Sequence, residues 1–148
     1  MFWAFLAMAA APSSDFSISD TTDNETGIRT VYALQADVDE AKRLSMLKFE
    51  CFEHRPSVTF EFYDFPTPEW AVILLGGGDS ADLPFVVQRV ADRRFELRLH
   101  GDPQVLINEL GEDSVRRFVV YGATGSRDVS FEMSGLHKAW QRVTSICR

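Results

Sequence analysis

The sequence has little of what most catalytic and metal-binding motifs require. It contains only two cysteines and three histidines among 148 residues, and none of them has the Cys-x-x-Cys or His-x₃-His spacing of a metal site. It has no Gly-x-Ser-x-Gly nucleophile elbow, and the glycines at 76–78 lack the Gly-Lys-Ser/Thr ending of a phosphate-binding loop. The sequence therefore predicts no catalytic residue, no metal ligand and no cofactor.

Basic residues are scarce relative to acidic ones. Lys and Arg number 15 against 22 Asp and Glu, which gives a formal net charge of −7. An acidic protein repels nucleic-acid phosphates and anionic lipid surfaces. The arginine pairs at 93–94 and 116–117 are isolated beside expected strands, where solvated strand ends explain them. We therefore expect no nucleic-acid partner.

The apolar run at residues 2–11 is too short to span a bilayer, which takes about 20 residues. It fits instead the central region of a secretory signal, and Ala7-Met-Ala9 matches a small-x-small cleavage site, although no Lys or Arg precedes the run. We expect residues 1–11 to be a signal peptide and the protein to be periplasmic or secreted, without stable membrane insertion. The alternative is an N-terminal core strand or helix.

The rest of the chain divides into a polar lead-in and one domain. Residues 12–27 are polar, and we expect at most one short strand there, around residues 16–18. Residues 28–148 have the length and composition of a single α+β domain. The chain contains 12 Phe, which predicts a core rich in phenylalanine.

Alternating apolar residues predict an antiparallel sheet built from hairpins. The expected strands are residues 29–36, 47–52, 58–62, 70–75, 84–90, 95–99, 114–121 and 128–133. Their inward-facing residues should include Leu47, Phe49, Cys51, Val58, Phe60, Phe62, Phe95, Leu97, Leu99, Val115, Phe118, Val120, Val129, Phe131 and Met133. The apolar strand 70–75 should be covered on both faces. Residues 37–43 should form a charged connection with at most one helical turn, and residues 54–57 a turn, since Pro56 fixes φ.

Two helices are expected. Asp102 is a good N-cap and Pro103 suits the first helical position, so a two-turn helix should begin there and stop at Gly111. Its helical spacing is marked by Val105, Leu106, Glu109 and Leu110. Ser134 should cap the last helix. The buried stripe of that helix should comprise Leu136, Ala139, Trp140, Val143, Ile146 and Cys147. The predicted fold class is α+β: an antiparallel, sandwich-like core of hairpins with one short helix and one C-terminal amphipathic helix.

Both cysteines fall on predicted core faces, Cys51 in mid-sheet and Cys147 at the end of the last helix. Such a pair is well placed for one disulfide that pins the helix to the sheet, and export would favour its oxidation. The bond would close a loop of about 97 residues, for which chain entropy gives about 4–5 kcal/mol. The alternative is two buried free thiols in a cytosolic domain.

The C-terminal pattern resembles a known family. Ser130-Phe-Glu-Met-Ser-Gly-Leu136 precedes an amphipathic helix and a near-terminal Cys, and Leu47-Lys-Phe-Glu-Cys51 forms an earlier strand with the other Cys. This arrangement is similar to the small secreted proteins associated with type VI secretion loci, the VasI-like group, over about residues 18–148. The resemblance implies a periplasmic or secreted accessory role and supplies no catalytic residue.

These observations predict a non-enzymatic exported accessory or binding domain with an envelope or secreted protein as its partner. Function in such a domain usually resides on exposed loops. The expected contact residues lie in two glycine-rich loops and beside them, and are Trp70, Gly77, Gly78, Thr124 and Gly125.

Two alternatives remain open from the sequence. One is a small-ligand or lipid carrier that uses the Phe-rich sheet face. The other is a hydrolase with a site assembled from dispersed residues, such as His100 with Asp102 or Ser126 with Asp128.

Overall fold

The structure is a computed structural model that describes residues 16–52, 54–75, 85–112 and 115–147. The elements follow one another as β1 (Ser17–Thr22), β2 (Arg29–Val38), β3 (Leu44–Phe52), β4 (Arg55–Tyr63), β5 (Ala71–Leu75), β6 (Phe85–Ala91), β7 (Arg94–Leu99), α1 (Pro103–Leu110), β8 (Val115–Gly122), β9 (Gly125–Glu132) and α2 (Leu136–Thr144). The expected signal peptide at residues 1–11 and the predicted contact residues Gly77 and Gly78 lie outside the described residues.

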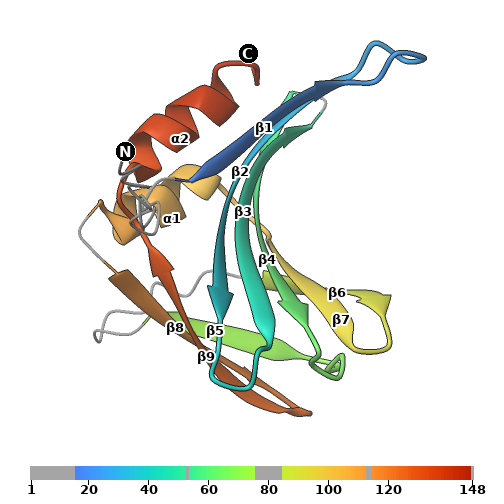
Figure 1. The fold of residues 1–148 in the computed structure, drawn as a ribbon, viewed down its shortest axis with the longest axis vertical. Helices are drawn as coiled ribbons and strands as arrows, with labels where there is room; N and C mark the ends of the chain where they lie inside the picture. Colours follow the sequence, from blue (N-terminus) through green and yellow to red (C-terminus); the bar gives the residue numbers. More distant parts are fainter. Residues whose placement is uncertain (1–15, 53, 76–84, 113–114, 148) are drawn as a thin grey trace, which may run out of the picture.

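The described strands form two antiparallel sheets. The larger sheet has the order β1-β2-β3-β4-β7-β6, and the smaller sheet has the order β5-β8-β9. The larger sheet is strongly curved, with the smaller sheet and both helices on its concave side (Figure 1). The architecture is therefore a sandwich made mainly of β-strands, with two short helices. It agrees with the predicted antiparallel core, but strands form a larger part of the fold than expected.

Phenylalanine fills the core, as the composition predicts. The fully buried rings are Phe49, Phe60, Phe62, Phe95, Phe118 and Phe131. The ring centroids of Phe60 and Phe118 are 5.1 Å apart, which joins the larger sheet to the smaller one through an edge-to-face contact. Of the predicted inward-facing residues, only Val115 is exposed, at 54%. The buried Phe118 and Val120 set the alternation of β8 and place Val115 on the outer face.

The polar N-terminal segment contributes more to the sheet than the sequence predicts. All six residues of β1 pair with β2, so the strand continues past the expected residues 16–18 to Thr22. Five of the six β1 residues are exposed. β1 lies at the edge of the larger sheet, so it does not require a row of apolar side chains on either of its faces. Phe16, directly before β1, is buried and packs on Phe49 with ring centroids 5.4 Å apart.

Two predicted connections are shorter than expected. Residues 37–43 contain no helix, because β2 continues to Val38 and the side chain of Asp39 closes a turn by accepting the N–H of Arg43 at 2.9 Å. Pro56 lies within β4 opposite Cys51, and the last pair of that hairpin is Phe52 with Arg55. The prediction of a turn at residues 54–57 is therefore confirmed for His54, which has φ 65°, and wrong for residues 55–57, where turn-forming residue types were given more weight than strand pairing.

The prediction that the strand at 70–75 is covered on both faces was also wrong. β5 is an outer strand of the smaller sheet. Ala71 and Ile73 pack against the core, whereas Val72 and Leu74 are 51% and 40% exposed. An apolar run therefore identified a strand here but not its burial.

Helix α1 forms as predicted. The side chain of Asp102 accepts the N–H of Gln104 at 2.9 Å, and Gly111 ends the helix with φ +62°. The buried face comprises Leu106, Ile107 and Leu110. Val105 is 45% exposed, so the buried stripe is rotated from the predicted one.

Helix α2 begins differently from the prediction. Gly135, with φ 78°, occupies the N-cap position, and the hydroxyl of Ser134 donates to Glu132 instead. The N–H of His137 is bound by the carboxylate of Glu112 at 2.8 Å. A distant side chain thus satisfies a helix N–H that a local cap was expected to bind.

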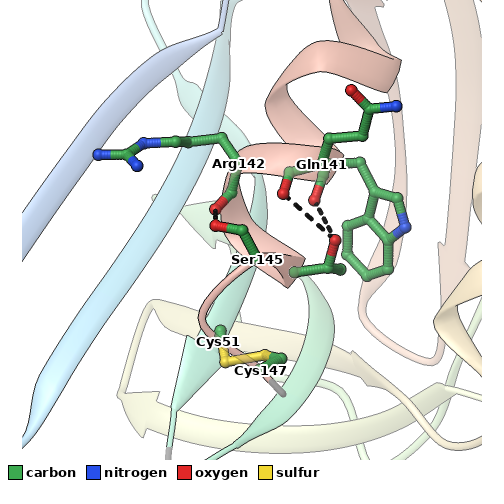
Figure 2. Close-up of a disulfide and its surroundings, with 7 residues drawn as sticks. Cys51, Gln141, Arg142, Ser145 and Cys147 are labelled. Atoms are coloured by element: carbon green, nitrogen blue, oxygen red, sulfur yellow. Dashed lines mark hydrogen bonds between the residues drawn. A yellow bond between two sulfur atoms is a disulfide. The ribbon is translucent and has the colours of Figure 1, made fainter.

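The predicted disulfide is present. Cys51 and Cys147 are bonded with their Cα atoms 5.8 Å apart across a sequence separation of 96. Figure 2 shows Cys147 just beyond the end of α2, reaching the strand that carries Cys51. The hydroxyls of Thr144 and Ser145 donate to the carbonyls of Trp140 and Arg142 at 2.9 and 2.7 Å, and the carbonyl of Arg142 is among those that the helix end leaves without a partner in the helix.

Candidate functional site

The structure brings two of the predicted contact segments together. The hydroxyl of Thr124, in the tight turn between β8 and β9, donates to the carbonyl of Pro66 at 2.7 Å. A Cβ atom at Gly122 would lie 3.0 Å from the carbonyl oxygen of Trp70, so the close approach of the chain before β5 depends on glycine there. Trp70, Thr124 and Gly125 consequently lie at the same end of the smaller sheet.

Four exposed apolar residues on and beside β5 and β8 form what we call the apolar strip. Its members are Trp70, Val72, Leu74 and Tyr121, with exposed fractions of 56%, 51%, 40% and 45%. Val72 lies directly opposite Tyr121, and Leu74 and Trp70 alternate with Val72 along the chain, so the strip shares one face. Single exposed valines are ordinary, whereas adjoining large apolar side chains mark an interaction surface.

The apolar strip adjoins an outer strand edge that lies close to β6 without pairing with it. β5 is an outer strand of the smaller sheet, and in the described residues no further strand is hydrogen-bonded to it. The opposite edge, on β9, is covered, because the N–H of Ser130 donates to the side chain of Asp37 in β2 at 3.1 Å. β5 therefore offers backbone donors and acceptors beside exposed apolar side chains.

A pocket of about 100 Å³ opens at the same end of the molecule. Its wall includes Arg43, Asp64, Phe65, Arg93, Thr124 and Ser126. The Nε atom of Arg43 lies 2.7 Å from the carboxylate of Asp39, and that of Arg93 lies 3.0 Å from the carboxylate of Asp64. The pocket thus combines two ion-paired arginines with the predicted contact residue Thr124.

Arg127, one residue beyond the pocket wall, is buried with 3% exposure. It donates to the carbonyls of Tyr63 and Asp64 at 2.8 and 2.9 Å, and its guanidinium lies 4.8 Å from the ring centroid of Phe65. Weaker contacts reach the hydroxyl of Ser45 and the carbonyl of Leu44. All these acceptors are neutral, and the buried Nε atom has no hydrogen-bond partner.

The surroundings of Arg127 leave its charge incompletely compensated. Burial lowers the pKa of Arg127, and the nearby charge of Arg43 lowers it further, while Asp39 and Asp64 act in the opposite direction. Desolvating a cation without a hydrogen-bonded carboxylate is costly. The hydrogen bonds of the Arg127 guanidinium nevertheless connect β9 to the chain around β3 and β4. These contacts explain why the guanidinium is buried.

A carboxyl pair occupies the outer face of the larger sheet. Glu61 in β4 lies directly opposite Glu96 in β7. Burial and the charge of Glu61 raise the pKa of Glu96. The ammonium of Lys48 and the hydroxyl of Tyr63 each donate to Glu61 at 3.2 Å. Neighbouring groups within the sheet thus compensate this pair, and we assign it a structural role.

The residues of the hydrolase alternative take part in other contacts. The side chain of Asp102 caps α1, and that of Asp128 pairs with Arg117 at 2.7 Å. Among the described residues, no hydrogen bond joins His100 to Asp102 or Ser126 to Asp128. The structure therefore assembles neither of the suggested catalytic pairs.

Sequence reasoning did not single out Arg127 or the pocket beside it. Arginine is rarely buried, and composition alone places it on the surface. The inward alternation of Val129, Phe131 and Met133, continued back along the strand, does place position 127 on the core face. That extension was the signal that could have identified it.

The chain matches no protein-family model, no curated protein and no solved structure. Across residues 16–52, 54–75, 85–112 and 115–147, no group of three His, Cys, Asp or Glu side chains is placed to hold a metal ion. Within the same ranges, no helix has the length and apolar character needed to cross a membrane.

Proposed function

We propose that this protein is an exported, non-enzymatic accessory domain that binds an extended segment of another protein along β5. The observation that carries the proposal is the apolar strip beside an outer strand edge. An added strand would hydrogen-bond to the edge of β5 that no described strand pairs with, while alternate side chains contact the strip. Exposed Trp and Tyr residues are the types that contribute most to protein–protein binding.

The disulfide supports an exported location, because such bonds persist mainly in oxidising compartments. The small-x-small site within the N-terminal apolar run and the resemblance to the VasI-like group favour the same location. We therefore propose an envelope or secreted protein as the partner, in the setting of a secretion apparatus.

The ligand-carrier alternative is not supported at the Phe-rich sheet face, because the hollow of about 440 Å³ in the described residues lies at the β1–β2 turn, between mostly threonine side chains. The Phe-rich face of the larger sheet is filled by packing against the smaller sheet, and Phe60 and Phe118 are fully buried. A carrier pocket for a drug-sized ligand typically has about 300–1,000 Å³ with mostly apolar walls. The Phe-rich face is core rather than a binding surface.

Affinity isolation from the native host tests the proposal. Immobilised wild-type protein should retain a defined envelope or secreted protein, and Trp70→Ala should weaken that binding by about tenfold to thirtyfold, as for an aromatic hot spot. Val72→Lys should abolish it. Val86→Lys is the matched control, since Val86 is 54% exposed on β6, an outer strand of the other sheet.

Equal retention of the same partner by Val72→Lys and Val86→Lys would contradict the proposed surface. Circular dichroism of each variant confirms that loss of binding does not come from loss of the fold.

A further inference from the structure

The pocket of about 100 Å³ concentrates positive charge on a protein whose formal net charge is −7. Arg43 and Arg93 line it, and the buried Arg127 follows the lining residue Ser126 in the chain. Asp39 and Asp64 supply the two carboxylates paired with the lining arginines. Arg127 interacts electrostatically with all four of these groups, so the cluster of three guanidinium groups and two carboxylates carries one surplus positive charge, with Arg127 buried behind the pocket wall.

The two lining arginines keep donors available. Each binds its aspartate through Nε, and in the described residues the terminal nitrogens of Arg43 and Arg93 donate to no other group. The aspartates hold the guanidinium planes in place, and the terminal nitrogens are the atoms that normally bind a carboxylate in parallel pairs. The side chain of Ser126 adds a hydroxyl to the same wall.

We propose that this pocket binds a carboxylate group. Its volume corresponds to about three water molecules, which suits a carboxylate and excludes a nucleotide-sized ligand. One surplus positive charge balances a singly charged carboxylate, whereas a doubly charged phosphate would leave one negative charge uncompensated beside Asp39 and Asp64. Phe65 and Pro66 provide an apolar wall for the carbon stem of the ligand.

Two sources could present this group: a free small carboxylic acid or the C-terminal carboxylate of a peptide. The chemistry of recognition is the same for both, because the pocket has room for the carboxylate and little more. The proposal does not depend on the apolar strip, although Ser126 of the pocket wall lies opposite Tyr121 of the strip.

A titration of ¹⁵N-labelled protein with sodium acetate tests the proposal, with sodium chloride holding the ionic strength constant. We expect saturable shifts of the backbone amides of Gly125 and Ser126. The double variant Arg43→Gln/Arg93→Gln should weaken binding about tenfold or more, since it removes two charge-assisted partners. Arg29→Gln is the matched control, because Arg29 is also paired with an aspartate but lies at the opposite end of β2.

The single variant Arg93→Gln repeats the test if the double variant does not fold, because Arg93 is 60% exposed and its loss should leave the core intact. It should weaken acetate binding at least severalfold. N-acetylglycine distinguishes the sources: tighter binding than acetate indicates a peptide C-terminus, and equal binding indicates a free acid. Either result supports a carboxylate site.

Three results would overturn the proposal. The first is a linear, non-saturating response of the wild-type amides to acetate. The second is an equal affinity for acetate in wild-type protein and in a folded variant that lacks Arg93. The third is tighter binding of inorganic phosphate than of acetate at matched ionic strength.

Discussion

Several individual side chains sit where elementary energetics would not place them, and each has an identifiable compensation. Arg127 is buried but donates to two backbone carbonyls within 2.9 Å. Glu96 faces another carboxylate, yet Lys48 and Arg98 are nearby. At Gly122 a Cβ atom would lie only 3.0 Å from its nearest neighbours. These are the residues at which conservative substitutions should have measurable effects.

Substitution of Glu96 should change how stability depends on pH. Because the pKa of Glu96 is raised above 4.5 in the folded protein, the folded state retains this proton where the unfolded state has lost it. The contribution of Glu96 to stability is therefore full at low pH and declines as pH rises through its raised pKa. Glu96→Gln should match wild type near pH 4 and be more stable near pH 7.

Urea denaturation at both pH values measures this difference. A variant that is less stable than wild type at neutral pH would show that the contacts of Glu96 with Lys48 and Arg98 outweigh its burial beside Glu61.

A methyl group at Gly122 should disturb the attachment of the chain before β5. The added Cβ of Gly122→Ala would lie 3.0 Å from both the Cβ of Pro68 and the carbonyl oxygen of Trp70. We expect a loss of about 1–3 kcal/mol in the free energy of unfolding, the usual range for overpacking. Ser130→Ala, at an exposed position on β9, is the control, and equal stability of the two variants would contradict the close contact.

The strands and helices show which sequence signals were sufficient. Strict alternation in β3, β7 and β9 predicted the buried faces correctly, because a strand with one covered face must alternate. In β4 it identified the apolar face, but Thr59 and Glu61 on the other face are buried as well. The N-cap and first-turn proline of α1 predicted its start. The short connections could not be predicted, because their lengths depend on strand pairing: β2 extends through polar residues, and Pro56 fits within β4.

The beginning of α2 and the position of β5 also depend on distant parts of the chain. Glu112, 25 residues away, binds the N–H of His137, and no local pattern indicates that contact. The exposure of Val72 and Leu74 follows from the place of β5 at the edge of a small outer sheet, which apolar composition cannot reveal. Of the predicted contact residues, Trp70, Thr124 and Gly125 share one end of the smaller sheet, although only their surface location was predicted.

Removal of the α1 cap should destabilise the domain modestly. Asp102→Ala leaves the N–H of Gln104 without the carboxylate that binds it at 2.9 Å, so we expect a loss of about 0.5–2 kcal/mol. Asp102→Asn should retain most of the stability, because asparagine caps nearly as well. Guanidinium denaturation compares the three proteins. Equal losses for Ala and Asn would indicate that charge, rather than the cap, matters at this position.

In the molecule as a whole, the disulfide joins the last helix to the centre of the larger sheet. Helix α2 has only nine residues, too few to be stable alone in water. It is held by the packing of Trp140 against Phe49, with ring centroids 5.7 Å apart, and by the bond between Cys51 and Cys147. The chain end, which otherwise tends to fray, is therefore fixed at a buried strand.

Loss of this bond should be the largest single change in stability discussed for this domain. We expect Cys147→Ser to lower the free energy of unfolding by about 2–5 kcal/mol, because a long loop of the unfolded chain is no longer closed. Reduced wild-type protein should show a similar loss, which controls for the serine itself. Equal denaturation midpoints for the oxidised wild-type protein and for Cys147→Ser would contradict this account of the chain end.

The proposed class of partner depends on two properties of the protein, namely its export and the oxidised Cys51–Cys147 bond. Measuring the intact mass of the protein recovered from its own host tests both properties. We expect a mass that lacks the residues up to Ala9 or Ala11, and a gain of two hydrogens after reduction. A full-length mass that reduction leaves unchanged would contradict export and an envelope partner, and would return the apolar N-terminus to the folded domain.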